Sequence, residues 1–155
     1  MSELIERLRQ HWLDQGITLG NGASEFEVGR FESKYNIALP DDFREYLLSI
    51  SWPVFEERWE IDDYLISFWS IDRIKNLKEK YPHFKNSEAE SYFIFADYSL
   101  SCHTYAIRLQ QKEAITPIFF TCYIAPDYPI IQIAFSFTEF LERYIANDEC
   151  MLFLK

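Results

Sequence analysis

The sequence predicts an α+β fold, a mainly antiparallel sheet of about five strands with helices packed against it. Helical periodicity dominates residues 1–50 and the C-terminal part of the chain, whereas short runs rich in aromatic and β-branched residues lie between them. Short loops join these runs, and consecutive strands joined in this way pair antiparallel. The length of 155 residues fits one folding unit, so a single domain over residues 1–155 is expected.

The N-terminal half has three helix signals. Apolar residues recur at helical spacing over residues 3–15, and Gly16 supplies a stop. Ser24 and Glu27 form a capping-box pattern at the start of a second helix, which we expect to end near Asn36. A third helix is expected over residues 41–50, with an apolar stripe of Phe43, Tyr46, Leu47 and Ile50.

Two further helices are expected later in the chain. Ser70 is placed to cap a helix that ends at Pro82 and carries Ile71, Ile74, Leu77 and Tyr81. Ser136 and Glu139 form a second capping-box pattern at the start of a C-terminal helix. The stripe of that helix consists of Phe137, Phe140, Leu141, Tyr144 and Ile145.

Five segments have the pattern of strands: residues 64–69, 92–96, 103–109, 118–123 and 130–135. The segment 92–96 is apolar on both faces, which favours a place inside the sheet. The segment 103–109 alternates, so Thr104, Ala106 and Arg108 are expected on a wetter face.

Composition limits the classes of function. The 25 acidic and 15 basic residues give a formal net charge of −10, which opposes direct binding of nucleic acid and favours a basic partner. No run approaches the ~18 apolar residues of a membrane span, and three widely spaced cysteines favour a cytoplasmic protein with reduced thiols. Glycine-rich nucleotide motifs are absent from the sequence, so no cofactor is expected.

An ordered set of motifs resembles one known family. The first motif resembles the opening of the SUKH superfamily, which includes the yeast cell-wall and glucan-synthesis regulator family, and it reads Val28-x-x-Phe31-Glu32-x-x-Tyr35-x-Ile37-x-Leu39-Pro40-x-Asp42-Phe43-x-x-Tyr46-Leu47. The segments Phe93-Ile94-Phe95-Ala96-Asp97, Tyr105-Ala106-Ile107 and Ser136-Phe137-x-x-Phe140-Leu141 follow in the order of that family. At Ser51-Trp52-Pro53 the chain departs from the Asn-Gly-Gly turn usual in such proteins.

The resemblance implies a SUKH-like binding module. Bacterial members of the superfamily are largely immunity proteins that neutralise a cognate toxin, often a nuclease, and fungal members are cell-wall regulators and interaction hubs. No catalytic residue can be carried over from the family to this sequence.

The acidic run over residues 56–63 is the leading candidate for partner binding. It surrounds an indole with carboxylates, a combination that suits capture of a basic partner, although such runs are often only solvated loops. The candidate residues are Glu56, Glu57, Trp59, Glu60, Asp62 and Asp63. Secondary candidates are Asp97, Tyr98 and Asp127, for which plain turn chemistry is the alternative.

Cys102, His103 and Cys122 raise the alternative of an enzyme or a metal site. Neighbours on a strand point to opposite faces, so Cys102 and His103 would not share a site there. No motif supplies the other groups of a thiol nucleophile, and no spacing supports a metal site.

Two hypotheses of function follow from the sequence. The first is an immunity protein that blocks the cleft of a basic, possibly nuclease, toxin domain. The second is a regulatory scaffold in cell-wall or stress signalling. The sequence leaves the oligomeric state open.

Overall fold

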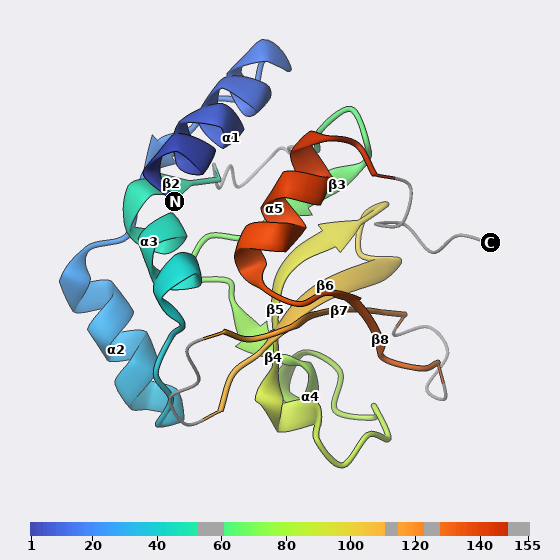
Figure 1. The fold of residues 1–155 in the computed structure, drawn as a ribbon. Helices are drawn as coiled ribbons and strands as arrows, with labels where there is room; N and C mark the ends of the chain where they lie inside the picture. The colour runs from blue at the N-terminus through green and yellow to red at the C-terminus, as the bar shows by residue number, and fades with distance from the viewer. Residues whose placement is uncertain (53–60, 111–114, 123–127, 149–155) are drawn as a thin grey trace.

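The centre of the molecule is an antiparallel sheet. In the computed structural model, which describes residues 1–52, 61–110, 115–122 and 128–148, the sheet has the order β3-β5-β6-β7-β8, with β4 also paired to β5 (Figure 1). Its strands are β3 (Ile66–Phe68), β4 (Lys75–Asn76), β5 (Tyr92–Tyr98), β6 (His103–Arg108), β7 (Ile118–Thr121) and β8 (Ile131–Ala134). A separate two-stranded ribbon pairs β1 (Gly20–Asn21) with β2 (Ile50–Ser51).

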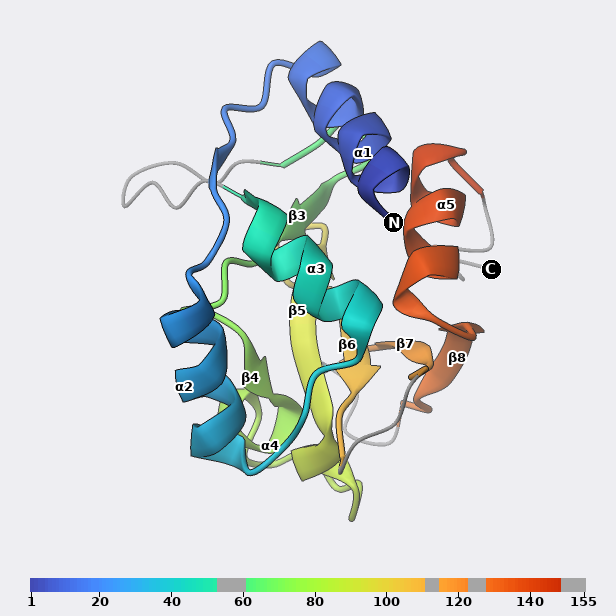
Figure 2. The same cartoon turned by 60° about the vertical axis from the view of Figure 1, so that its left-hand side comes forward.

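Helices cover the sheet. They are α1 (Ser2–Asp14), α2 (Glu25–Tyr35), α3 (Asp41–Ser49), α4 (Leu77–Lys80), α5 (Phe137–Ile145) and the 3-10 helix η1 (Ala89–Ser91). Helix α1 packs against α5, and α3 packs against both α2 and α5 on the same side of the sheet (Figure 2). The predicted α+β fold with an antiparallel sheet is therefore confirmed.

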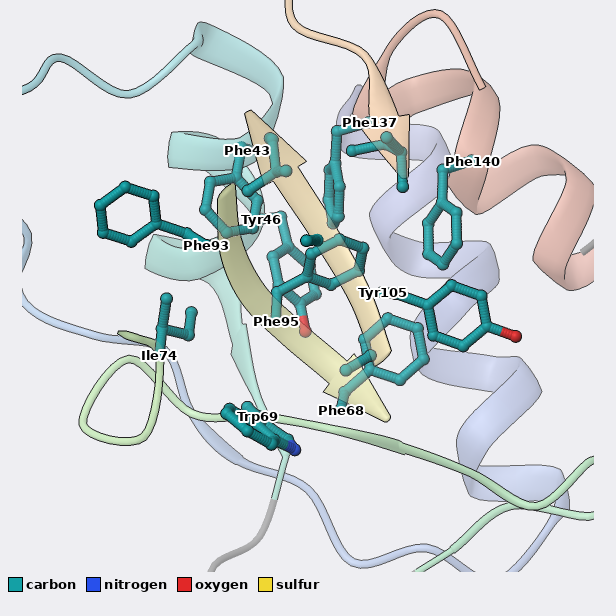
Figure 3. Packing of buried hydrophobic residues seen from close by; sticks show 14 of the residues in the cluster. Phe43, Tyr46, Phe68, Trp69, Ile74, Phe93, Phe95, Tyr105, Phe137 and Phe140 are labelled. Carbon is teal, nitrogen blue, oxygen red and sulfur yellow. The ribbon is translucent and has the colours of Figure 1, made fainter. Parts of the chain in front are cut away.

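An aromatic core joins these helices to the sheet. The ring of Phe95, in β5, lies 6.0 Å from Phe43 of α3, and 5.4 and 5.1 Å from Phe137 and Phe140 of α5, measured between centroids (Figure 3). Edge-to-face contacts at these distances add to the free energy gained from burying the rings. The apolar stripes predicted for α3 and α5 are the surfaces that form this core.

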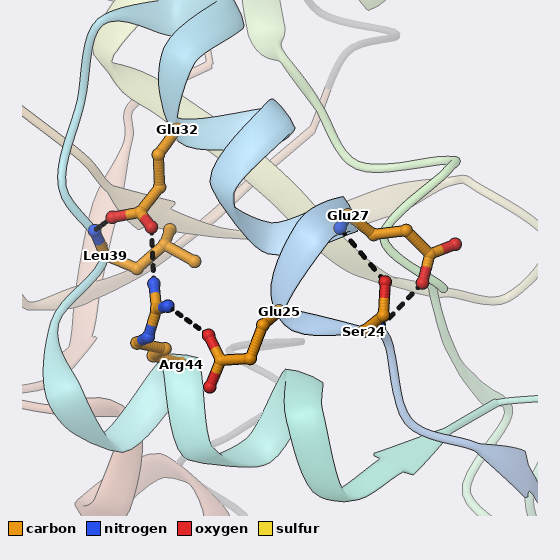
Figure 4. Close-up of polar contacts among 6 residues, drawn as sticks. All are labelled: Ser24, Glu25, Glu27, Glu32, Leu39 and Arg44. Atoms are coloured by element: carbon orange, nitrogen blue, oxygen red, sulfur yellow. Dashed lines mark hydrogen bonds and ion pairs between the residues drawn. The ribbon is translucent and has the colours of Figure 1, made fainter.

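Local capping explains where helix α2 starts and ends. Ser24 and Glu27 form the expected capping box, and Asn36 ends the helix in the left-handed conformation, with φ 53°. Arg44 of α3 contacts the carboxylates of Glu25 (2.6 Å) and Glu32 of α2 (Figure 4). Helices α2 and α3 are therefore tied by charge as well as by packing.

The helix predicted from Ser70 to Pro82 is wrong in most of its length. Lys75 and Asn76 instead form β4 and pair with Ile94 and Phe93 of β5. Asn76 caps only the short helix α4. Pairing with the central sheet has overridden the helical periodicity of this segment, because strand pairing satisfies backbone groups while Ile74 and Leu77 of the predicted stripe are buried.

The wetter face expected for β6 is found only at Arg108, which is half-buried, and the expectation is wrong for Thr104 and Ala106. Thr104 and Ala106 are both buried. Ala106 lies in register between Ile94 on β5 and Phe119 on β7, and the larger neighbours shield its small side chain from water. Between its end residues, His103 and Arg108, the strand is buried on both faces.

The segment that departs from the family pattern contributes to the core. The indole of Trp52 is buried, with its ring centroid 4.9 Å from that of Trp12 in α1. Gly22 precedes α2 where a Cβ atom would lie 2.1 Å from the carbonyl oxygen of Leu48, so only glycine fits. Pro53 lies outside the described residues.

Phe43 provides a test of the aromatic core. Replacing Phe43, which is fully buried, by alanine should lower the free energy of unfolding by about 3 to 5 kcal/mol, because the substitution removes buried surface and leaves a cavity. Phe26→Ala is the matched control, since Phe26 is 73% exposed, and it should change stability by less than about 0.5 kcal/mol. Urea denaturation measures both, and equal effects would contradict the core described here.

Candidate partner-binding surface

Strand pairing brings together two of the acidic segments predicted from the sequence. Ile66 and Ser67 of β3 pair with Tyr98 and Asp97 of β5, so the turn before β3 lies beside the turn after β5. The amide of Ser99 donates to the carbonyl of Leu65 at 2.9 Å and joins the two turns. The other predicted contact residues, Glu56, Glu57, Trp59, Glu60 and Asp127, lie outside the described residues.

Asp62 is a structural residue of the first turn. Its side chain is only 4% exposed, and its Oδ1 atom accepts hydrogen bonds from the amides of Tyr64 and Ile66, both at 2.8 Å. Its Oδ2 atom accepts the hydroxyl proton of Tyr144, and that hydroxyl in turn accepts from Nε1 of Trp12 at 2.8 Å. The expectation that Asp62 faces a partner is thus corrected, because its carboxylate is buried and already accepts from two amides and a hydroxyl.

Burial changes the acidity of the groups around Asp62. It raises the pKa of the Asp62 carboxyl, and hydrogen bonds from Tyr144 and the two amides oppose this shift. It also raises the pKa of the Tyr144 hydroxyl, and the charge of Asp62 raises it further. Burial lowers the pKa of His11, whose ring lies edge-on to Tyr144 at 5.2 Å, so the imidazole is held toward its neutral form.

Asp97 has the same role in the second turn. It is 1% exposed, its Oδ2 atom accepts from Nε1 of Trp69 at 2.6 Å, and its Oδ1 atom accepts from the amide of Ser101 at 3.0 Å. Burial raises the pKa of Asp97, whereas the bond from Trp69 and the nearby charge of Arg73 lower it. Like Asp62, Asp97 is enclosed in the fold and is removed from the predicted contact surface.

The exposed residues of the two turns are different from those predicted. Leu65 is 43% exposed and Leu100 is 60% exposed, and both have a positive φ, as have Ser99 and Ser101. A left-handed conformation costs a residue with a side chain about 1 kcal/mol, so the buried aspartates hold the turns in a shape that the chain alone disfavours. Sequence reasoning missed the leucines, since no local pattern marks them as exposed.

Two exposed acidic residues lie where the first turn meets the end of α1. Asp63 is exposed, and its amide donates to Oε1 of Gln15 at 2.7 Å, which places it next to the exposed Asp14 at the end of α1. We call Asp14, Asp63, Leu65 and Leu100 the turn surface. Of the predicted residues, Asp63 belongs to it, and Tyr98 lies half-buried behind it with its ring 6.0 Å from that of His103.

The alternative of a catalytic or metal site finds little in the geometry. His103 stacks on Phe120 with ring centroids 5.0 Å apart, burial lowers its pKa, and its Nδ1 atom has no hydrogen-bond partner in the described part of the chain. Within those same residues, no three His, Cys, Asp or Glu side chains gather as metal ligands would.

None of the helices described is long and apolar enough to cross a bilayer.

The fold and this surface define a class of protein, an α+β module with exposed leucines and carboxylates at two hydrogen-bonded turns and the neighbouring end of α1. The model of the SMI1 / KNR4 family (SUKH-1) matches residues 22–143, and the chain belongs to this family. Proteins of this family are generally non-enzymatic immunity or regulatory proteins, and the immunity proteins bind a cognate toxin. A search of curated proteins found no match to the sequence.

The two neighbouring aspartates provide a matched test of the first turn. Asp62→Asn should lower the free energy of unfolding by about 1 to 3 kcal/mol, because the hydroxyl of Tyr144 loses its charged acceptor. Asp63→Asn should be nearly neutral, since its side chain is exposed. Urea denaturation at neutral pH measures the free energy of unfolding of both variants.

The same pair has a pH dependence of defined sign. The pKa of Asp62 is raised in the folded state, so its contribution to stability is complete below the unfolded pKa of about 4 and is lost as pH rises through the folded pKa. Because an asparagine at this position does not titrate, the stability of the wild type minus that of Asp62→Asn should fall over this window. If the difference in free energy of unfolding between the wild type and Asp62→Asn stayed constant or grew with pH, the raised pKa of folded-state Asp62 would be contradicted.

Proposed function

We propose that this protein is a cytoplasmic immunity protein that binds a cognate basic toxin domain and blocks its cleft, without chemistry of its own. Membership of the SUKH-1 family supports a protein partner, and the net charge of −10 supports a basic one. The observation that carries the proposal is the turn surface, in which Asp63 and two leucines are exposed on turns held by buried aspartates. We extend the module to all of residues 1–155.

The turn surface offers two kinds of contact. Carboxylates such as Asp14 and Asp63 would steer a basic domain and speed its association, in a manner screened by salt over a Debye length of about 8 Å. Leu65 and Leu100 would then exclude water at the contact, and burial of their exposed side chains would add an apolar contribution to the affinity. Because hydrogen bonds fix both turns before binding, little conformational entropy would be lost on association.

The acidic run predicted from the sequence stays part of the proposal. The carboxylates of Glu56, Glu57 and Glu60 come shortly before Asp63 in the chain and would extend its negative charge, and the indole of Trp59 would add an aromatic contact. Asp127 also stays a proposed partner-binding residue, on the ground of its negative charge alone.

A regulatory scaffold in cell-wall or stress signalling is the second candidate. The observation that favours it is the burial of Asp62 and Asp97. It leaves a turn surface that is less acidic and more apolar than expected for an inhibitor that imitates the phosphates of a nucleic acid in a nuclease cleft. A scaffold would bind a host protein and would not protect cells from a toxin.

Charge reversal at the turn surface tests the proposal. The partner for the test is a cognate basic toxin domain, to be sought at the end of a reading frame next to this gene, and protection is scored as growth of cells that produce that domain. Asp63→Lys should slow association with that domain about three- to tenfold at low ionic strength and leave the free energy of unfolding unchanged, because steering depends on surface charge.

Glu90→Lys is the control, since Glu90 is exposed in η1, just before the start of β5, whereas the two turns of the turn surface meet at the opposite end of that strand, where Tyr98 pairs with Ile66. It should alter association much less. Equal effects of the two reversals, or binding indifferent to salt, would refute steering by the turn surface. Failure of the wild type to protect growth while it binds a host protein would favour the scaffold.

A further inference from the structure

One glutamine connects the end of α1 to the first turn of the turn surface. Gln15 follows α1 directly, and its Oε1 atom accepts from the backbone amide of Asp63 at 2.7 Å. Its Nε2 atom lies 2.9 Å from Nε2 of His11 and donates to the carbonyl oxygen of His11 at 3.3 Å. The side-chain amide of Gln15 thus contacts both α1 and the turn.

The backbone fixes the orientation of this side-chain amide. The N–H group of Asp63 can only donate, so it requires the oxygen of Gln15 and directs the NH₂ group of Gln15 toward His11. The NH₂ group can only donate as well. Nε2 of His11 must therefore be the acceptor, and the imidazole is neutral with its proton on Nδ1.

A protonated His11 does not fit this arrangement. An imidazolium has a proton on both ring nitrogens, so Nε2 would direct an N–H group at the NH₂ group of Gln15. Rotation of the Gln15 amide by half a turn would offer its oxygen to the imidazolium. The same rotation would bring the NH₂ group to the N–H group of Asp63, where two donors would face each other. A bond from charged His11 to Gln15 and the bond from Asp63 to Gln15 therefore exclude each other.

The groups around His11 act on its charge in both directions. Among the described residues, those that face it lie on its own helix, on the segment before β3 and on α5, and they are Asp14, Asp62, Asp63, Tyr64 and Tyr144. Burial outweighs the attraction of the three carboxylates and lowers the pKa of His11. The ring is therefore neutral at neutral pH and gains its proton only as the pH falls below the ordinary histidine pKa of about 6.5.

We propose that His11 and Gln15 form a pH-sensitive latch between α1 and the turn surface. With His11 neutral, Gln15 holds the amide of Asp63, and protonation of His11 takes the oxygen of Gln15 away from that amide. The turn then keeps its bonds to Asp62 but loses its connection to the end of α1, where Asp14 lies. Weaker capture of a basic partner in acid would follow, and this consequence alone rests on the proposed function.

The position of the proton on His11 is the first test. Long-range ¹H–¹⁵N spectra of the full chain at neutral pH distinguish a protonated ring nitrogen from an unprotonated one. We expect the proton on Nδ1 and an unprotonated Nε2. A proton on Nε2 would overturn the proposal, because Gln15 would then have no acceptor on the ring.

Hydrogen exchange measures the latch itself. The protection of the Asp63 amide, corrected for the intrinsic pH dependence of exchange, should fall about three- to tenfold as His11 becomes protonated, as expected for the loss of one hydrogen bond. Its midpoint should match the titration of the His11 ring in the same sample. Protection that is absent at neutral pH, or that stays constant through this titration, would overturn the proposal.

Gln15→Glu separates the latch from a simple effect of charge. A carboxylate can accept from the Asp63 amide and from the imidazolium together, so this variant should raise the pKa of His11 and keep the Asp63 amide protected throughout. If protection were still lost as His11 became protonated in Gln15→Glu, the positive charge alone would loosen the turn and the latch would be refuted.

His83→Gln is the matched control. His83 is exposed and follows α4, which lies at the far end of the sheet from α1 (Figures 1 and 2). This variant should show the same pH dependence of Asp63 protection as the wild type, and loss of that dependence would assign it to the wrong histidine and overturn the latch. No partner enters these measurements, so failure of the latch and failure of the proposed function remain distinguishable.

Discussion

The carboxylate of Asp62 is the constraint on which the rest of the candidate site depends. Its two oxygens receive the amides of Tyr64 and Ile66 and the hydroxyl of Tyr144, which also accepts from the indole of Trp12. One buried group therefore connects α1, α5 and the start of β3. Removing any partner leaves a buried donor or acceptor unsatisfied, which costs more free energy than the bond itself contributes.

Asp97 repeats this arrangement on the neighbouring strand. In both turns an aspartate Oδ1 atom accepts from the amide four residues later, Ile66 for Asp62 and Ser101 for Asp97. Each carboxylate thus fixes the backbone conformation of its turn. Because it is buried, it contributes no acidic group to the molecular surface. The consequence is a turn surface with exposed leucines on turns whose conformation is fixed by hydrogen bonds, and such pre-organisation lowers the conformational entropy lost when a partner binds.

Local and non-local signals explain how much could be read from the sequence. The capping box at Ser24 and the stripes of α3 and α5 were predictable, because caps and periodicity act within one or two turns of helix. The helix from Ser70 was predicted wrongly, since only the pairing of β4 with β5 decides that segment. Asp62 and Asp63 look alike in the sequence, and whether a carboxylate is buried or exposed depends on residues far away, such as Tyr144.

The most direct measurement of the central claim is native-state hydrogen exchange at the amides of Tyr64 and Ile66, in the wild type and in Tyr144→Phe. If Asp62 holds the turn through Tyr144, both amides are protected in the wild type, and the loss of one hydroxyl speeds their exchange much more than that of Ala106 in the central strand β6. Unprotected amides in the wild type, or a uniform change across the turn and β6, would contradict the account.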